Sequence, residues 1–173
     1  MRIGLVGTMS VGKTTLAKAL GETEQFKDYP VQTERSKYLR DLGIPLNTDS
    51  TLRGQFVFLA ERATELLYDK IITDRTIWDV CSFTLSAKSI ADWEKRDFVT
   101  AAMHLREYYD LVIYVSPEGV NMEDNGVRET DEVYRKKIDQ VIQMMLNEYK
   151  PKKLITVKGS TEERIATIIS NLN

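Results

Sequence analysis

The sequence predicts an α/β protein of three layers, in which helices cover both faces of a mostly parallel five-stranded sheet. Short apolar segments alternate along the chain with segments of helical periodicity, as is typical of parallel sheets whose strands are joined by helices. One stretch between the first strand and the first helix matches the pattern G-x-x-x-x-G-K-[ST]: Gly7, Thr8, Met9, Ser10, Val11, Gly12, Lys13 and Thr14. We expect residues 1–173 to form one domain around this stretch.

The elements follow from apolar periodicity, taken in chain order. Strands are expected at 2–6, 29–33, 70–74, 110–117 and 153–157. Pro30 lacks an N–H group for a sheet ladder, so either it is expected near the start of the second strand or that strand is expected at an edge of the sheet. Between the strands we expect helices at 15–20, 34–41, 50–66, 78–87, 92–109, 130–145 and 160–172.

Periodicity also predicts which helix faces are buried. Asp49 or Ser50 is expected to cap the third helix, and Ser160 with Glu163 forms a capping box for the last one. Trp93 is expected to point inward, together with Leu105 and Tyr109. In the third helix, spacing gives an apolar stripe of Leu52, Phe56, Leu59, Ala63 and Leu66. Four polar residues of that helix are expected off the stripe: Arg53, Gln55, Glu61 and Arg62.

Composition restricts the class of protein. The net charge of -2 argues against a non-specific binder of duplex DNA, which would usually be basic. Cys81 is the only cysteine, so no disulfide forms within the chain and a reducing compartment is expected. No apolar run is long enough for a membrane span, and the first strand begins without a signal peptide. We therefore expect a cytoplasmic protein with no membrane partner.

The glycine stretch is suited to bind phosphate groups. Its glycines let the backbone approach an anion closely, while backbone N–H groups and the following helix N-terminus point toward it. Lys13 is expected to face solvent and to reach the β- and γ-phosphates, and the Thr14 hydroxyl is expected to bind Mg²⁺. The cofactors implied are ATP, with GTP as the alternative donor, and Mg²⁺, held by residues 7–14 and Thr15.

An acid and an arginine follow the third strand directly. Asp74 ends the strand and is expected to hold magnesium or to accept a proton from an acceptor hydroxyl. Its alternative role is that of a helix cap. Arg75 is expected to bind an acceptor phosphate or the transferred group, or else to pair with Asp79. Both residues fall at the carboxyl edge of a parallel sheet, where ligands of such sheets bind.

Four further residues are candidates for binding the acceptor. Glu34 and Arg35 follow the second strand; Glu34 is the alternative general base, and Arg35 would bind a phosphate or a ring. Arg53 and Gln55 open the next helix, where the glutamine amide would recognise a base through two hydrogen bonds. The alternative for Glu34 and Arg35 is a solvated helix start.

The polar segment 118–130 lacks apolar periodicity and contains two glycines. It predicts a mobile loop that closes over a bound nucleotide, so a lid is expected at about 118–135. Arg128 in the loop and Arg135 in the helix behind it would reach the phosphates. Alternatively, Arg135 is a solvated charge that pairs with Asp131 or Glu132.

Three features together resemble the nucleoside and nucleotide kinase branch of the P-loop NTPases: Lys13-Thr14-Thr15 in the glycine loop, Asp74-Arg75 after a strand, and the segment from Gly126-Val127-Arg128 to Tyr134-Arg135. Within this branch the chain is similar to thymidylate kinase-like proteins and to the nicotinamide riboside kinase-type domain, including virus-encoded relatives. The resemblance implies transfer of the γ-phosphate of ATP to a free nucleoside or nucleoside monophosphate in the cytoplasm, which is the host cytoplasm for a viral protein.

Three alternatives stay open. The acceptor is nicotinamide riboside, or it is a hydroxymethyl base such as 5-hydroxymethyluracil within DNA, which makes DNA a partner. The third alternative is a regulatory NTPase in which hydrolysis drives a conformational switch. No guanine-recognising N-K-x-D sequence and no recruiting tail support that last alternative.

Overall fold

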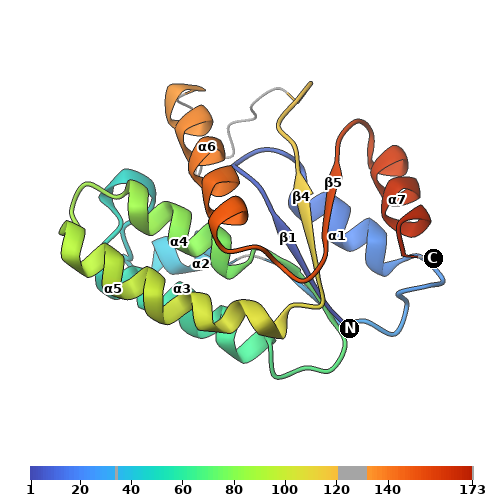
Figure 1. Ribbon diagram of the computed structural model, residues 1–173, viewed down its shortest axis with the longest axis horizontal. Coiled ribbons are helices and arrows are strands. Elements are labelled where there is room, and N and C mark those ends of the chain that lie inside the picture. The colour runs from blue at the N-terminus through green and yellow to red at the C-terminus, as the bar shows by residue number, and fades with distance from the viewer. Residues whose placement is uncertain (34, 121–131, 173) are drawn as a thin grey trace.

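The computed structural model describes residues 1–33, 35–120 and 132–172 (Figure 1). Its sheet has five strands in the order β2-β3-β1-β4-β5, and every neighbouring pair is parallel. The strands are β1 (Arg2–Val6), β2 (Val31–Gln32), β3 (Ile71–Asp74), β4 (Leu111–Val115) and β5 (Leu154–Val157). The predicted fold class is confirmed, and the short β2 lies at the edge that Pro30 predicts.

Helices cover both faces of the sheet. Helices α1 and α7 contact each other on one face, and α2 to α6 lie on the other (Figure 1). Two short 3₁₀ helices, Asn47–Asp49 and His104–Tyr108, lie before α3 and after α5. The α-helices are α1 (Lys13–Gly21), α2 (Ser36–Asp41), α3 (Leu52–Glu65), α4 (Ile77–Ser86), α5 (Asp92–Met103), α6 (Glu132–Glu148) and α7 (Thr161–Ser170).

The two faces of the sheet have separate hydrophobic cores, and β4 shows why. Successive side chains of a strand point to opposite faces. Val112 and Tyr114 of β4 therefore pack with α3 to α6, whereas Leu111, Ile113 and Val115 pack with α1 and α7. All five are apolar or aromatic and buried, as is expected of a central strand covered on both sides.

The buried face of α3 differs from the predicted stripe. Gln55, Phe58 and Arg62 are buried, whereas Phe56 is 50% exposed. The prediction that Gln55 and Arg62 lie off the buried face is therefore wrong. The buried face includes two polar residues, Gln55 and Arg62. A prediction based on apolar residues alone ignores them and therefore misplaces the face.

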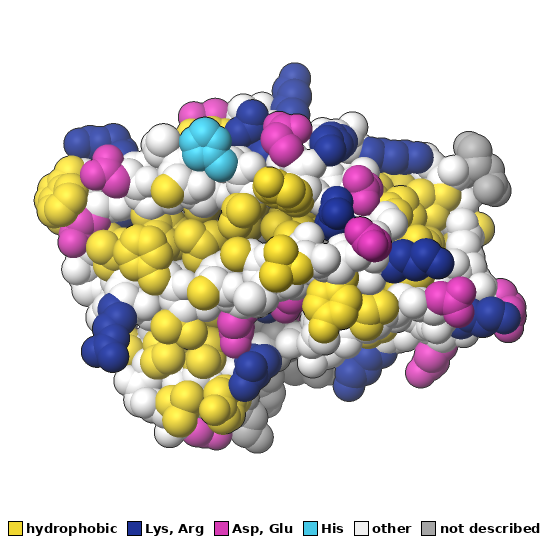
Figure 2. All heavy atoms as spheres, turned by 90° about the horizontal axis from the view of Figure 1, so that it is seen from below, with side chains coloured by type: hydrophobic (Ala, Val, Ile, Leu, Met, Phe, Trp, Pro, Cys, Tyr) yellow, Lys and Arg dark blue, Asp and Glu magenta, His cyan; other side chains and the backbone are white. Residues whose placement is uncertain are grey.

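The prediction for Trp93 is also wrong, since its side chain is 60% exposed. The buried face of α5 contains Phe98, Val99, Ala102 and Met103. Trp93 lies five residues before Phe98, and residues three or four apart share a helix face. Figure 2 shows the lower face of the molecule, on which exposed apolar side chains gather. Tyr109, by contrast, is buried as predicted.

The helix caps are partly as predicted. Ser160 caps α7, and its capping box with Glu163 is confirmed. Thr51 rather than Asp49 or Ser50 caps α3, because the Thr51 hydroxyl accepts a hydrogen bond from the Gly54 N–H at 3.2 Å. A 3₁₀ turn at Asn47–Asp49 occupies the residues just before this cap, which moves the start of α3 along the chain.

Candidate active site

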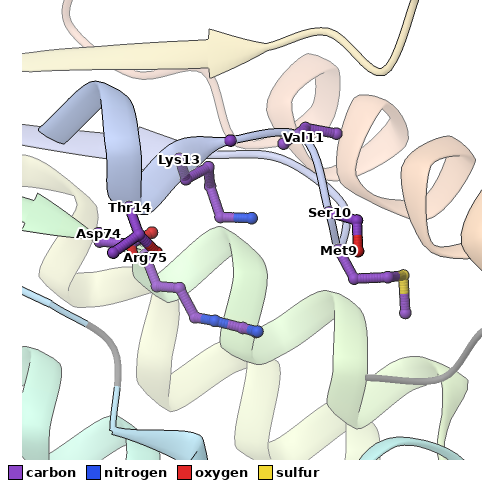
Figure 3. Close-up of a pocket in the computed structure, with 8 residues that line it drawn as sticks. Met9, Ser10, Val11, Lys13, Thr14, Asp74 and Arg75 are labelled. Atoms are coloured by element: carbon purple, nitrogen blue, oxygen red, sulfur yellow. Dashed lines mark hydrogen bonds between the residues drawn. The ribbon is translucent and has the colours of Figure 1, made fainter. Parts of the chain in front are cut away.

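The glycine loop joins the carboxyl end of β1 to α1, and its two glycines are required for different reasons. A Cβ at Gly7 would lie 2.7 Å from the Val115 carbonyl oxygen, so only glycine allows β1 and β4 to approach this closely. Gly12 has a φ of 81°, in the left-handed region that glycine adopts without strain. Ser10 also has a positive φ, 58°. The loop shares one pocket with the end of β3, lined by Met9, Ser10, Val11, Gly12, Lys13, Thr14, Asp74 and Arg75 (Figure 3).

Three helices on both sides of the sheet hold the loop in place. The Asp79 carboxylate of α4 accepts a hydrogen bond from the Gly7 N–H at 3.3 Å. The Thr8 hydroxyl donates to the Arg135 carbonyl oxygen of α6 at 3.0 Å. Arg164 of α7 donates from Nη1 to the Val11 carbonyl oxygen at 2.7 Å. The loop is therefore fixed by contacts between residues far apart in the sequence.

Lys13 does not face solvent as predicted, since it is only 7% exposed. Its Nζ donates to the carbonyl oxygens of Gly7 at 2.6 Å and Thr8 at 2.8 Å. The ammonium group lies inside the curve of the loop because these carbonyl oxygens point toward it. A lysine in this position is beside any anion that the loop binds.

Thr14 and Asp74 come together at the mouth of the loop. The Thr14 hydroxyl donates to Asp74 Oδ2, and Asp74 is only 2% exposed. The sheet register, which pairs Leu5 with Asp74, brings the end of β3 beside the end of β1. A hydroxyl and a carboxylate are ligands that Mg²⁺ accepts, so the pair fits the predicted metal. In the described part of the chain, no group of three or more His, Cys, Asp or Glu residues is placed to hold a metal ion by itself.

Asp74 is not the cap of the helix that follows it. Thr76 caps α4, and the Asp79 carboxylate accepts hydrogen bonds from the Thr76 N–H at 2.8 Å and the Thr76 hydroxyl at 2.9 Å. Asp79 is completely buried. Burial raises the pKa of Asp79, although the neighbouring charges of Lys13 and Arg75 favour its ionised form. The Asp74 carboxylate is therefore directed at the glycine loop rather than at a helix end.

Arg75 lines the same pocket as the glycine loop (Figure 3). Its φ of 120° is unusual for a residue with a side chain, so the turn after β3 is strained. The guanidinium carbon lies 4.9 Å from the centre of the Phe83 ring. The cation–π contact favours a defined position for the side chain, which follows Asp74 and lines the same pocket.

The predicted acceptor residues are less closely grouped. Arg35 and Arg53 are exposed, whereas Gln55 is buried. The Arg35 guanidinium lies 3.7 Å from a carboxylate oxygen of Glu61 and 4.5 Å from the centre of the Tyr38 ring. Neither Arg35 nor Arg53 nor Gln55 lines the glycine-loop pocket. Glu34 lies outside the described residues.

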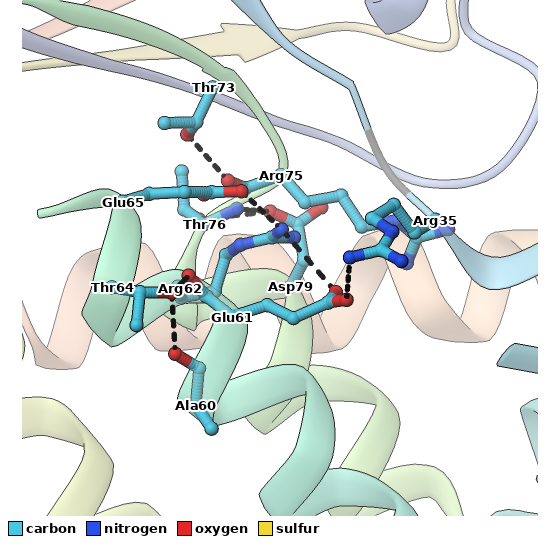
Figure 4. A network of polar contacts seen from close by, with 10 residues as sticks. All are labelled: Arg35, Ala60, Glu61, Arg62, Thr64, Glu65, Thr73, Arg75, Thr76 and Asp79. Atoms are coloured by element: carbon cyan, nitrogen blue, oxygen red, sulfur yellow. Dashed lines mark hydrogen bonds and ion pairs between the residues drawn. The ribbon is translucent and has the colours of Figure 1, made fainter. Parts of the chain in front are cut away.

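A polar cluster of Arg35, Glu61, Arg62 and Glu65 lies near the end of β3 (Figure 4). Arg62 is 1% exposed and donates from Nη2 to Glu65 at 2.6 Å, while Glu61 lies 3.7 Å away. Burial lowers the pKa of Arg62, but the hydrogen-bonded Glu65 carboxylate outweighs this effect and raises it overall. In the sequence, only the spacing of three residues between Arg62 and Glu65 on a helix indicates that they pair.

The lid prediction falls mainly outside the described residues, which exclude 121–131 and therefore Arg128. Arg135 is described, and it is 5% exposed, so it is not a solvated charge. Its Nη1 donates to the Val120 carbonyl oxygen at 2.9 Å and lies 3.6 Å from Glu132. Arg135 does not line the glycine-loop pocket but a neighbouring cavity beside Tyr114 and Asp139.

Asp79 and Arg164 are site residues that sequence reasoning missed. Thr76 and Asp79 have the T-x-x-D spacing of a capping box, which would have placed Asp79 at the start of α4 but not against Gly7. Nothing in the local sequence connects Arg164 with Val11, since the two are separated by 153 positions.

Comparison with known structures supports this description of the fold. A deoxyadenosine kinase from M. mycoides with bound dCTP is 18% identical, with a TM-score of 0.71, and the match covers 100% of this chain and 99% of that one. The NadR protein in complex with NR is 14% identical with a TM-score of 0.77, covering 98% of this chain and 50% of that one. Thymidylate kinase from Candida albicans is 16% identical with a TM-score of 0.68, covering 99% and 90%.

At these identities the likeness shows the fold alone, which is that of P-loop nucleoside and nucleotide kinases. No curated protein shows significant sequence similarity to the chain. Among the described residues, no helix is long and apolar enough to cross a membrane. A protein-family model described as an AAA domain, AAA_28, matches residues 2–164. Because this match spans nearly the whole sequence, the chain belongs to the AAA_28 family of AAA domains.

Proposed function

We propose that this single-domain protein is a kinase that transfers the γ-phosphate of ATP to a nucleoside or nucleoside monophosphate. The observation that carries the proposal is the meeting of Thr14, Asp74 and Arg75 at the mouth of the glycine loop. Phosphoryl transfer needs positioning, a metal ion and positive charge around the moving group. This one pocket offers candidates for all three.

The donor phosphates would lie against the N–H groups of residues 7–15, with Lys13 beside the β- and γ-phosphates. Thr14 and Asp74 would hold Mg²⁺, which neutralises charge that develops on the phosphate oxygens. Arg75 would stabilise the transferred group or an acceptor phosphate. Arg128 and Arg135, in the segment at 118–135, would add positive charge near the phosphates. The role of Arg128 rests on the sequence alone.

In the reaction, the acceptor hydroxyl oxygen forms a bond to the γ-phosphorus while the bond from that phosphorus to the β–γ bridging oxygen breaks. The bridging oxygen leaves with ADP. The hydroxyl proton passes to a carboxylate: to Glu34 where Asp74 holds the metal ion, or to Asp74 where it does not. On the acceptor side we propose Arg35, Arg53 and Gln55 as binding residues. The ion pair with Glu61 holds the Arg35 side chain beside α3.

The choice of acceptor is tested by transfer of label from γ-³²P-ATP. The panel contains deoxynucleosides, nucleoside monophosphates, nicotinamide riboside and a DNA duplex that carries 5-hydroxymethyluracil. We expect label on a free deoxynucleoside or nucleoside monophosphate. Label on nicotinamide riboside or on the duplex would replace the proposed acceptor while keeping the kinase. Hydrolysis of ATP with no labelled acceptor would overturn the kinase proposal in favour of a regulatory NTPase.

A further inference from the structure

We propose that Arg164 of α7 is a positioning residue of the glycine loop, which orients the Gly12 N–H toward the phosphates of the bound nucleotide. The proposal rests on the proposed function, because it takes the loop to be the phosphate site. Arg164 is 4% exposed, and its Nη1 donates to the Val11 carbonyl oxygen at 2.7 Å. This contact joins the last helix of the chain to its first loop.

The geometry of a peptide unit connects this contact with phosphate binding. No cis peptide bond occurs among the described residues, and in a trans unit the C=O and the following N–H point in opposite directions. Arg164 holds the Val11 carbonyl oxygen on the α7 side of the loop. The Gly12 N–H must then point to the opposite side, away from α7. Val11 and Gly12 both line the pocket that we assign to the phosphates.

The backbone on both sides of this peptide fits the same role. Ser10 and Gly12 have positive φ values of 58° and 81°. Residues of alternating conformation make consecutive N–H groups converge on one point, which gives an anion-binding concavity. Without Arg164, the Val11–Gly12 peptide would be free to rotate its N–H group out of this concavity. A hydrogen bond from a charged guanidinium also polarises the peptide and strengthens the N–H as a donor.

Arg164 is more tightly packed than a surface arginine that happens to touch the loop. A Cβ added at Gly12 would lie 3.2 Å from Arg164 Nη1, so the guanidinium lies directly against the loop backbone. Burial lowers the pKa of Arg164, and its Nε has no hydrogen-bond partner among the described residues. A buried cation with an unsatisfied N–H is costly for folding. A triphosphate on the other side of the loop would offset the part of that cost that comes from the buried charge.

The first turn of α7 holds Arg164 in place. The Arg164 N–H donates to the Ser160 carbonyl oxygen at 3.0 Å, and Ser160 and Glu163 close the capping box around this turn. Helix α7 also packs on α1, which begins at Lys13. The guanidinium is therefore attached to the same structural unit as the phosphate-binding helix.

The test measures dissociation constants by isothermal titration calorimetry for two probes, MgADP and magnesium tripolyphosphate. Arg164→Met keeps the aliphatic packing but removes the donor and the charge. We expect this variant to raise the dissociation constants of both probes by at least ~10-fold, the effect of losing one charge-assisted hydrogen bond. Arg164→Lys keeps the charge without the planar fork and should recover part of the affinity. The matched control is Ala166→Gly, an exposed substitution in the middle of α7 that destabilises the same helix and should leave both affinities unchanged.

A second readout separates positioning from mere stability. In the unaltered protein, MgADP should shift the Gly12 amide proton resonance, and Arg164→Met should reduce that shift even at saturating ligand. Unchanged affinities in a folded Arg164→Met protein would overturn the proposal. If Arg164→Met does not fold, Arg164→Gln decides the question by the same comparison with Ala166→Gly. An unaltered protein that binds neither probe would overturn the proposed function as well.

Discussion

Asp74 is the residue on which the proposed chemistry depends most. Its carboxylate is 2% exposed and accepts a hydrogen bond from Thr14, the residue that follows the loop lysine. Asp74→Asn keeps the size of the side chain but removes its charge. We expect turnover to fall by at least ~100-fold, because the variant loses a metal ligand or a general base.

Affinity for MgADP should change far less in Asp74→Asn, since the loop N–H groups still hold the phosphates. Steady-state turnover and calorimetric affinity, measured side by side with Asp49→Asn as an exposed control, distinguish these effects. Turnover equal to that of the unaltered protein would show that the chemistry takes place elsewhere.

Lys13 gives a second prediction at this scale. Lys13→Ala removes the ammonium group and its hydrogen bonds to Gly7 and Thr8. We expect turnover to become undetectable, while the free energy of unfolding falls by about 1–3 kcal/mol because two carbonyl oxygens lose a charged donor. Circular dichroism should still show a folded protein, since the free energy of unfolding of such domains is about 5–15 kcal/mol. Normal turnover in a folded variant would contradict the role of the loop.

At the scale of single elements, the sequence-based prediction and the structure assign different residues as the cap of α3, and this difference can be tested. Thr51→Ala removes the hydroxyl that accepts from the Gly54 N–H, and it should lower the free energy of unfolding by about 0.5–2 kcal/mol. Asp49→Ala changes the exposed residue that the sequence favoured and should have a smaller effect. Urea denaturation of both variants measures the difference. A larger loss in Asp49→Ala would show that the helix begins earlier.

Local sequence patterns predicted which strands and α-helices exist but misplaced the buried face of α3 and the direction of Trp93 on α5. The strand β4 was predictable because five consecutive apolar residues, Leu111 to Val115, form a short run rich in β-branched residues that Pro117 soon ends, as is typical of a strand buried on both faces. Helix α3 was harder to place, because the Arg62 side chain is buried through its hydrogen bond to Glu65. A buried charge of this kind is compensated by one partner, and patterns of apolar residues do not reveal it.

In the candidate site, the residues at strand ends were predictable from the sequence, whereas the residues that helices contribute were not. The loop and Asp74-Arg75 lie at the ends of strands, so the topology of a parallel sheet brings them to one edge. The residues that hold the loop, Asp79 and Arg164, come from helices on opposite faces. Their contacts depend on how the layers pack, which no local pattern encodes.

At the scale of the whole molecule, the loop is the point at which both hydrophobic cores meet. Asp79 belongs to α4, on the face covered by α2 to α6, and Arg164 belongs to α7 on the other face. A ligand that orders the loop therefore acts on both layers at once. Binding should stabilise the entire domain rather than one half of it.

Thermal unfolding tests this expectation. A ligand at 100 times its dissociation constant adds about 2.7 kcal/mol to the free energy of unfolding. For a domain of this size, each kcal/mol raises the midpoint by about 2–4 °C, so MgADP should raise Tm by about 5–10 °C in a single transition. Chelating magnesium with EDTA should remove part of the increase, because the Mg²⁺ that we propose Thr14 and Asp74 hold is then removed. Lys13→Ala serves as the control and should show a much smaller shift. Two separate transitions, of which only one responds to MgADP, would contradict a single domain built around the loop.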